Sequence, residues 1–310
     1  MSEQPKQYIY GPVPSRRLGR SLGVDLVPFK VCTYDCIYCQ LGRTTNKTME
    51  RKEWVPFEPV LTQLKAKLDL EPDYITLAGS GEPTLYSKMR ELIIRIKEFT
   101  DIPVVVLTNG SLLWIPEVRE ALLPADLIVP SLDAGSSELF RYVNRPHADI
   151  EFGKMLEGLV KFRDQYSGQY WLEVFLLGGV TTVEAQLNML SHCIKQIGPD
   201  KVQLNTVTRP PVEQYAEAVP RERLEQIAHQ LDDKAEVIAA YSHEEATDSF
   251  RSDSKGIVNL LKRRPCSLQD IAAGLGLRPN EVVKQVTHLA SEGTIRVREQ
   301  NGALYYETVL

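Results

Sequence analysis

Three cysteines within eight residues are the clearest chemical feature of the sequence. Cys32, Cys36 and Cys39 have the spacing C-x3-C-x2-C in the segment VCTYDCIYCQLG. Thiolates are soft ligands that suit iron–sulfur clusters and zinc. A structural zinc site usually has four ligands, whereas a cubane cluster on three cysteines leaves one iron open to another ligand. The spacing therefore favours an iron–sulfur cluster over zinc, and over core packing of three cysteines on one helical face.

The other two cysteines, Cys193 and Cys266, stand far from this motif and from each other. An odd total with three clustered residues is not the pattern of a disulfide scaffold. We expect both to be small residues packed in the interior.

A second motif, LAGSGEPTL, occupies residues 77–85 at the end of an apolar run. Gly79 and Gly81 allow the backbone to approach a ligand closely, and Glu82 can accept a hydrogen bond from an ammonium group. The alternative, a turn rich in glycine and proline, does not account for a glutamate at a strand end. We therefore expect a ligand-binding loop here.

Polar residues also follow three other apolar runs. The carboxyl ends of parallel strands converge around one cavity, so these side chains are expected to face the same ligand. Each of them alone is as well explained as a turn former or a helix cap. The candidates are Asn109, Ser131, Asp133 and Asn205.

Several arginines are candidates for binding a phosphate or carboxylate of a substrate, because a guanidinium offers bidentate hydrogen bonds. Three of them, Arg16, Arg17 and Arg20, lie in GPVPSRRLGRSLG just before the cysteine motif, and the others are Arg145 and Arg209. The alternative for the first three is a solvated run of charge.

The elements that must position these residues form a repeating pattern of β-branched runs and amphipathic stretches. Near-continuous apolar runs are typical of parallel strands covered on both faces, and right-handed crossovers join such strands. The expected strands are residues 22–27, 74–78, 103–108, 127–132, 170–177 and 201–207, with a seventh at 235–241. Residues 1–241 are therefore predicted to form an α/β domain, a partial (β/α)6 barrel.

The composition changes after this region. Residues 242–254 are polar without periodicity and are predicted to be a linker. Residues 255–310 show three helical patterns and two strand-like runs around Asn301-Gly302, a two-residue hairpin signal. This order predicts a small winged helix-turn-helix domain. Its net charge is +3 against −8 for the remainder, which favours a nucleic-acid partner; a protein or peptide partner and a scaffolding role are the alternatives.

The overall composition is that of an ordinary globular protein. The hydrophobic fraction is 43%, the charged fraction 25% and the net charge −5. No run of eighteen apolar residues is present, which argues against a membrane span, and the N-terminal residues lack the pattern of a secretory signal. We expect a cytoplasmic protein without membrane contact.

The cysteine motif, with the aromatic Tyr38 just before its last cysteine, resembles the cluster loop of the radical S-adenosylmethionine (SAM) superfamily. The resemblance covers roughly residues 20–240. It implies a 4Fe–4S cluster on the three cysteines, which would be the catalytic and metal-binding residues. It also implies reductive cleavage of SAM to methionine and a 5′-deoxyadenosyl radical, with electrons from an external flavodoxin- or ferredoxin-like donor.

The same resemblance implies where SAM binds. The order Gly79-Ser80-Gly81-Glu82-Pro83 is similar to the family element that holds the methionine amine, and Tyr38 would lie against the adenine. The implied SAM contacts are Tyr38, Gly79, Gly81, Glu82, Asn109, Ser131, Asp133 and Asn205. The family's fifth-strand motif is poorly matched, because LEVFLLGGV offers Gly178 and Gly179 without a familiar acidic partner.

The serine inserted between the two glycines resembles relatives of the wybutosine-synthesis subgroup, which implies modification of an RNA base. Two other functions fit the same residues. One is a radical SAM enzyme that modifies a peptide or protein gripped by the C-terminal domain. The other is a DNA-binding regulator that senses the cluster and SAM without catalysis.

Overall fold

The centre of the molecule is an eight-stranded sheet with the strand order β1-β2-β5-β6-β7-β8-β9-β10. The structure, a computed structural model, describes residues 6–15, 17–239, 254–275, 277, 279–300 and 303–309. Neighbouring strands from β2 to β10 are parallel, and β1 pairs antiparallel with β2. The strands are β1 (Ile9–Ser15), β2 (Gly19–Asp25), β5 (Tyr74–Ala78), β6 (Val104–Thr108), β7 (Leu127–Pro130), β8 (Gln169–Leu176), β9 (Lys201–Thr206) and β10 (Ala235–Val237).

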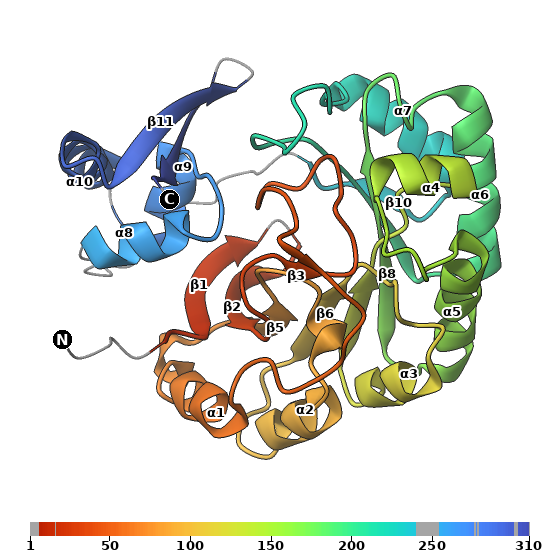
Figure 1. Ribbon diagram of the computed structural model, residues 1–310, viewed down its shortest axis with the longest axis horizontal. Coiled ribbons are helices and arrows are strands. Elements are labelled where there is room, and N and C mark those ends of the chain that lie inside the picture. The colour runs from red at the N-terminus through yellow and green to blue at the C-terminus, as the bar shows by residue number, and fades with distance from the viewer. Residues whose placement is uncertain are drawn as a thin grey trace.

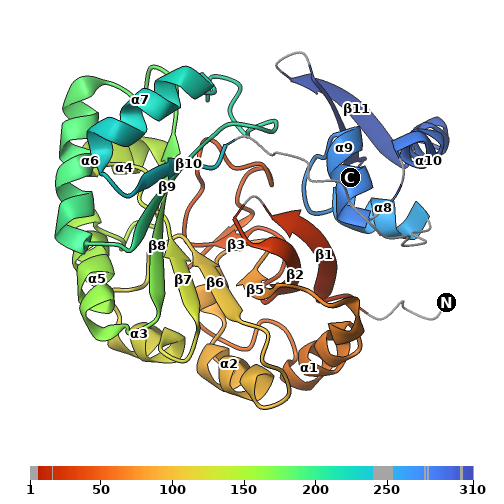
Figure 2. The ribbon, with the colours of Figure 1, turned by 180° about the vertical axis from the view of Figure 1, so that it is seen from behind.

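The helices that connect these strands lie on the outer side of the curved sheet, as Figures 1 and 2 show from opposite sides. Each buries one apolar stripe against the strands; α2, for example, buries Leu92, Ile93 and Ile96. Burial of one such side chain contributes roughly 1.5–3 kcal/mol. The helices are α1 (Phe57–Lys65), α2 (Met89–Lys97), α3 (Pro116–Leu122), α4 (Ser137–Val143), α5 (Phe152–Gln165), α6 (Glu184–Ile197) and α7 (Arg221–Leu231), with the 3-10 turns η1 (Leu68–Leu70) and η2 (Pro83–Leu85).

The expected partial α/β barrel is confirmed, and all seven expected runs contain a strand of the sheet. β1 was not among the predicted strands, because most of its residues fall in the segment GPVPSRRLGRSLG, which was considered only for its arginines. Gly11, Pro12 and Pro14 disfavour a strand there, but β1 lies at the sheet edge, where the missing N–H of a proline does not break a ladder. Because β1 turns directly into β2, it carries Arg17 to the open edge of the barrel.

A small C-terminal unit follows, with three helices and an antiparallel hairpin in the expected order. Register pairing of Gln300 with Ala303 leaves two residues for the turn; that tip and residues 242–253 of the expected linker lie outside the described residues. The elements are α8 (Ser254–Leu261), α9 (Leu268–Leu275), α10 (Pro279–Ser291), β11 (Ile295–Gln300) and β12 (Ala303–Thr308). The winged-helix assignment itself stays a prediction.

The C-terminal unit has its own apolar core and packs against the β1 edge of the barrel (Figures 1 and 2). Val13 of β1 extends that core. Arg263 forms an ion pair with Asp25 at 2.6 Å, and the Tyr305 hydroxyl donates to the Thr208 carbonyl at 2.6 Å. The unit therefore closes over one side of the barrel.

The two cysteines outside the cluster motif lie in the interior of the protein. Cys193 in α6 and Cys266 in the C-terminal core are both buried and unpaired, which confirms that expectation. In the described part of the chain, no helix is both long and apolar enough to cross a membrane.

Candidate active site

The three clustered cysteines lie in a loop that leaves the carboxyl end of β2. Cys32 is in the short strand β3 (Val31–Cys32), which pairs with β4 (Asn46–Lys47) and thereby closes the loop. The Cys39 N–H donates to the Cys36 carbonyl at 3.2 Å. All three thiols are half-buried and free of disulfides. The sequence thus placed the motif correctly, at the strand end where active sites of such barrels are built.

Each thiol has a nitrogen donor beside it. The Asn109 amide lies 3.6 Å from the Cys32 sulfur, the Asn144 amide lies 3.5 Å from Cys36, and Lys30 Nζ lies 3.1 Å from Cys39. Donors of this kind stabilise negative sulfur and tune a metal centre bound to it.

Burial disfavours the charged thiolate form of two of the three cysteines. Burial raises the pKa of Cys32 to about 12 and that of Cys36 well above its ordinary value. In the described part of the chain, no three His, Cys, Asp or Glu side chains are gathered tightly enough to hold a metal ion. The support for an iron–sulfur cluster is therefore the presence of three thiols, each with its own nitrogen donor, together with the similarity to known proteins described below.

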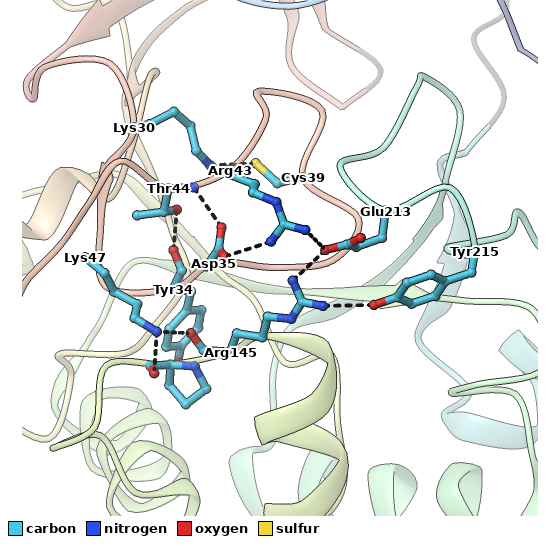
Figure 3. Close-up of polar contacts among 11 residues, drawn as sticks. Lys30, Tyr34, Asp35, Cys39, Arg43, Thr44, Lys47, Arg145, Glu213 and Tyr215 are labelled. Atoms are coloured by element: carbon cyan, nitrogen blue, oxygen red, sulfur yellow. Dashed lines mark hydrogen bonds and ion pairs between the residues drawn. The ribbon is translucent and has the colours of Figure 1, made fainter.

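A polar network fixes the cysteine loop from outside (Figure 3). Asp35 accepts from the Thr44 N–H at 2.7 Å, which closes the loop on itself. Glu213, in the segment after β9, pairs with Arg43 at 2.7 Å and with Arg145 at 2.6 Å. Arg145 is therefore a positioning residue of this loop, and its predicted role in substrate binding stays a prediction.

The Gly79–Glu82 loop packs directly against the cysteine loop. A Cβ on Gly79, whose φ is +130°, would lie 2.4 Å from Asp25 Oδ1, and one on Gly81 would lie 1.8 Å from the Val31 carbonyl oxygen. The two glycines are thus required for the close approach of the loops, whatever they contact beyond it.

Glu82 is buried, with 1% of its surface exposed. Its Oε1 accepts from the Thr84 N–H at 3.0 Å and from the Thr84 and Thr108 hydroxyls at 2.6 Å each, and its Oε2 accepts from the Asn109 N–H at 2.8 Å. Burial raises the pKa of Glu82, and these four donors oppose that shift. The carboxylate thus joins the ends of β5 and β6; the predicted contact with the SAM amine stays a prediction.

Asp133 plays a similar part at the end of β7. It accepts hydrogen bonds from the Tyr38 hydroxyl, from the Asn144 amide at 2.7 Å and from the Phe175 N–H at 3.1 Å. Burial raises the pKa of Asp133 to about 6. The Tyr38 ring stacks on Phe175 with centroids 3.9 Å apart. Asp133 therefore positions Tyr38 and Asn144, and through Asn144 the Cys36 thiol.

A cavity of about 410 Å³ opens beside Cys39 on the inner side of the barrel. It is bounded by strand residues of the barrel, such as Thr76 and Glu173, on one side and by residues of α8 and α9 of the C-terminal unit on the other. Of the predicted SAM contacts, Tyr38, Gly79, Ser131 and Asn205 line it. Glu82 and Asp133 are buried, and these two residues, Gly81 and Asn109 do not line it.

The predicted substrate arginines separate into two groups. Arg17 and Arg209 line the cavity, whereas Arg20 donates to the exposed Leu70 carbonyl at 2.8 Å. Arg16 lies outside the described residues.

The sequence analysis missed several residues of the cavity and the thiol shell. It found no acidic partner in the fifth strand, but Glu173 of β8 lines the cavity and bonds Arg17 at 2.9 Å and Asn205 at 2.9 Å. A carboxylate within a strand that is otherwise buried was the available signal. Lys30, Arg263 and Arg264 gave no such signal, because only the tertiary fold brings them to the site.

Comparisons with known proteins agree with this geometry. The model of the radical SAM superfamily matches residues 26–188. The chain is 38% identical over 303 residues to a protein named GTPase Obg from Brachyspira hyodysenteriae, covering 96% of this chain and 45% of the relative. It is 41% identical over 210 residues to a UPF0026 protein of Methanocaldococcus jannaschii, covering 66% of this chain and 65% of the relative. The chain thus spans less than two thirds of the length of either.

A UPF0026 protein of Helicobacter pylori (strain 26695) is 38% identical over 216 residues, covering 68% of this chain and 69% of the relative. Among solved structures, Streptococcus suis SuiB bound to S-adenosylmethionine superposes with a TM-score of 0.52 at 16% identity, covering 70% of this chain and 50% of SuiB. A radical SAM methyltransferase from Sphaerobacter thermophilus gives 0.52 at 18% identity, covering 70% and 66%. These structures share the fold with the described barrel.

Proposed function

The chain belongs to the radical SAM superfamily and, within it, to the UPF0026 proteins, and we propose that it cleaves SAM reductively to act on a substrate in the 410 Å³ cavity. The observation that carries this proposal is the set of three thiols, each with its own donor, at the edge of that cavity. When bound and reduced, a 4Fe–4S cluster would supply the electron that converts SAM to methionine and a 5′-deoxyadenosyl radical, which abstracts hydrogen from the substrate.

The residues of this chain have separable tasks in the proposed reaction. Cys32, Cys36 and Cys39 would hold the cluster, while Lys30 and the two asparagine amides stabilise the charge on sulfur. Ser131 and Asn205 line the cavity, and in this proposal they would hydrogen-bond SAM. The C-terminal unit covers the cavity and excludes water from a reactive radical.

The reductant requires access to the cluster. A second cleft, of about 760 Å³, runs between the cysteine loop and the C-terminal unit and also reaches Cys39. Its basic side chains include Arg43, Lys262, Arg296 and Arg298. We propose that an acidic flavodoxin- or ferredoxin-like donor docks there, so that the rate of cluster reduction falls as ionic strength rises.

Product formation tests the proposed reaction. The protein is purified anaerobically, its cluster is confirmed by electron paramagnetic resonance, and 5′-deoxyadenosine is measured after addition of SAM and dithionite. We expect 5′-deoxyadenosine from the wild type. An intact cluster without that product would contradict the proposal and favour the sensing regulator.

The finer substrate assignments remain hypotheses with their own readouts. Modification of an RNA base requires that tRNA co-purify with the protein and lose a modified nucleoside in cells that lack it. Modification of a peptide or protein requires that a polypeptide co-purify with the enzyme when the C-terminal unit is intact. The mass of that polypeptide must change in the reaction. The UPF0026 relatives give the wybutosine-related assignment no support.

A further inference from the structure

The wall of the 410 Å³ cavity carries an excess of positive charge. Four arginines line it against two carboxylates, Glu173 and Asp270. Two of the arginines, Arg17 and Arg209, belong to the barrel; the other two, Arg263 and Arg264, belong to the C-terminal unit. The two units therefore meet at a concave, cationic surface.

Two of these guanidinium groups have buried nitrogens that find no acceptor in the part of the chain that the structure describes. The Arg17 side chain is 11% exposed and pairs with Glu173 through Nη2, but its Nη1 has no partner among the described residues. The Arg209 side chain is 10% exposed; Nη1 donates to Gln40 and Nη2 to Asp270, and Nε has no partner there. A buried donor left unpaired costs about 1–3 kcal/mol. Both nitrogens therefore leave a hydrogen bond open to an acceptor that the described residues do not supply.

The charges show what kind of acceptor fits. Arg263 is neutralised by Asp25 at 2.6 Å, whereas Arg264 forms no ion pair within the described part of the chain. Burial, and then the like charge of Arg264, lowers the pKa of Arg209. Asp270 pairs with Arg209 and only influences Arg264 through its charge, so an anion placed between the two neighbouring cations would stabilise both.

Building on the proposed function, we infer that the substrate carries a carboxylate or phosphate group that Arg17, Arg209 and Arg264 bind. A cavity of 410 Å³ is within the range of roughly 300–1,000 Å³ typical of small-molecule sites. Cys39 and Tyr38 line the same cavity, so anchoring the anionic end fixes where the rest of the substrate lies relative to the cofactor. The C-terminal unit thus completes the substrate site.

Anion binding to the SAM-loaded holoenzyme tests this inference. The probes are inorganic phosphate and malonate, compared with chloride at constant ionic strength, and the readout is the thermal unfolding midpoint as a function of anion concentration. We expect one of the two probes to stabilise the wild type. Stronger stabilisation by phosphate indicates a phosphorylated substrate, and stronger stabilisation by malonate indicates a carboxylate.

Variants locate the site. Arg209→Gln and Arg264→Gln should each weaken binding of the effective anion by about tenfold or more, while Asp270→Asn should strengthen it, because it removes a competing carboxylate from Arg209. Arg20→Gln is the matched control and should leave the affinity unchanged. If Arg209→Gln does not fold, Arg264→Gln and Asp270→Asn, with their opposite signs, still carry the test.

Three results would overturn the inference. The first is that neither anion stabilises the wild type, and the second is that these variants leave the affinity for the anion unchanged. The third is that the arginine variants lose their affinity for SAM, which would show that the arginines bind the SAM carboxylate. Release of 5′-deoxyadenosine without substrate reports separately on the proposed function. The failure of one therefore cannot be mistaken for the failure of the other.

Discussion

The two sides of the cavity differ in how their buried charges are satisfied. On the cysteine side, Glu82 accepts four hydrogen bonds and Asp133 accepts three, all from the protein itself. On the side that faces the C-terminal unit, Arg17 and Arg209 are also buried, yet each keeps a nitrogen without an acceptor in the described chain.

This difference separates a preorganised region from one that is complete only with a ligand. The buried carboxylates use their hydrogen bonds to lock strand ends and loops, so the thiols are held in place before any cofactor binds. The arginines are already desolvated, so an anion that reaches them gains charge-assisted hydrogen bonds. Four substitutions test the contrast, beginning with the largest expected effect.

Replacement of a cluster ligand should abolish the reaction. Cys36→Ser removes a soft ligand whose sulfur faces Asn144, and we expect both the visible iron–sulfur absorbance and 5′-deoxyadenosine to fall below detection. Cys193→Ser, at a buried cysteine of α6, is the matched control and should retain both. A Cys36→Ser protein that still releases 5′-deoxyadenosine would remove this cysteine from the site.

Glu82→Gln should be the most destabilising single change on the preorganised side. It places an amide NH2 group among four donors, and loss of a buried, fully bonded charge costs about 3 kcal/mol. Urea denaturation of the apoprotein measures this cost without any contribution from SAM. The exposed pair partner Glu50 offers a control, since Glu50→Gln should change the free energy of unfolding by less than about 0.5 kcal/mol. Equal effects of the two substitutions would show that Glu82 does not lock the strand ends.

Much of the fold could be predicted because its signals are local. Apolar runs such as YITLA and PVVVLT are nearly continuous, and each became a parallel strand covered on both faces. β1 could not be predicted this way, because its glycine and prolines oppose a strand locally and only its position at the sheet edge permits one. A local sequence pattern cannot predict a strand whose formation depends on its position in the tertiary fold.

The residues of the site also fall into two classes: those that the local sequence predicts and those that only the tertiary fold brings together. The cysteine motif and Glu82 are recognisable from neighbouring residues alone. The cationic surface is not, because Arg17 and Arg264 are 247 positions apart in the sequence and meet only when the C-terminal unit packs on β1. Asp133 was visible as a polar residue near a strand end, but its hydrogen bond with Asn144, at the C-terminus of α4, and the path that this bond makes to Cys36 required coordinates.

The packing of the C-terminal unit can be weakened without touching the barrel core. Arg263 pairs with Asp25 and stacks on Tyr10, 3.9 Å from the ring centroid. Arg263→Ala should cost about 2 kcal/mol, since an ion pair and a cation–π contact are lost while Asp25 keeps its two bonds from Ser80. Hydrogen exchange in α8 should accelerate, with exchange in β5 unchanged.

Lys255→Ala, at an exposed position of α8, controls for the loss of a cation from the C-terminal unit. Unaltered protection of α8 in Arg263→Ala would mean that the unit is held by its apolar contacts with Val13. The side of the cavity that faces the C-terminal unit would then be held more rigidly than expected for a region that is complete only with a ligand.

The smallest expected effect is at the outer network of the cysteine loop. Glu213 is mostly buried and shared by Arg43 and Arg145 (Figure 3), but Arg43 is 64% exposed, so water screens part of the interaction. Glu213→Gln should cost about 1 kcal/mol and let a chelator remove the cluster a few-fold faster, while cleavage of SAM by the loaded protein stays unchanged. Glu217→Gln, an exposed neighbour in the same segment, should leave cluster loss at the wild-type rate. If Glu213→Gln instead lowers the rate of SAM cleavage with the cluster retained, Glu213 belongs to the reacting side of the cavity, and the boundary between the preorganised and ligand-completed regions must be moved outward to include it.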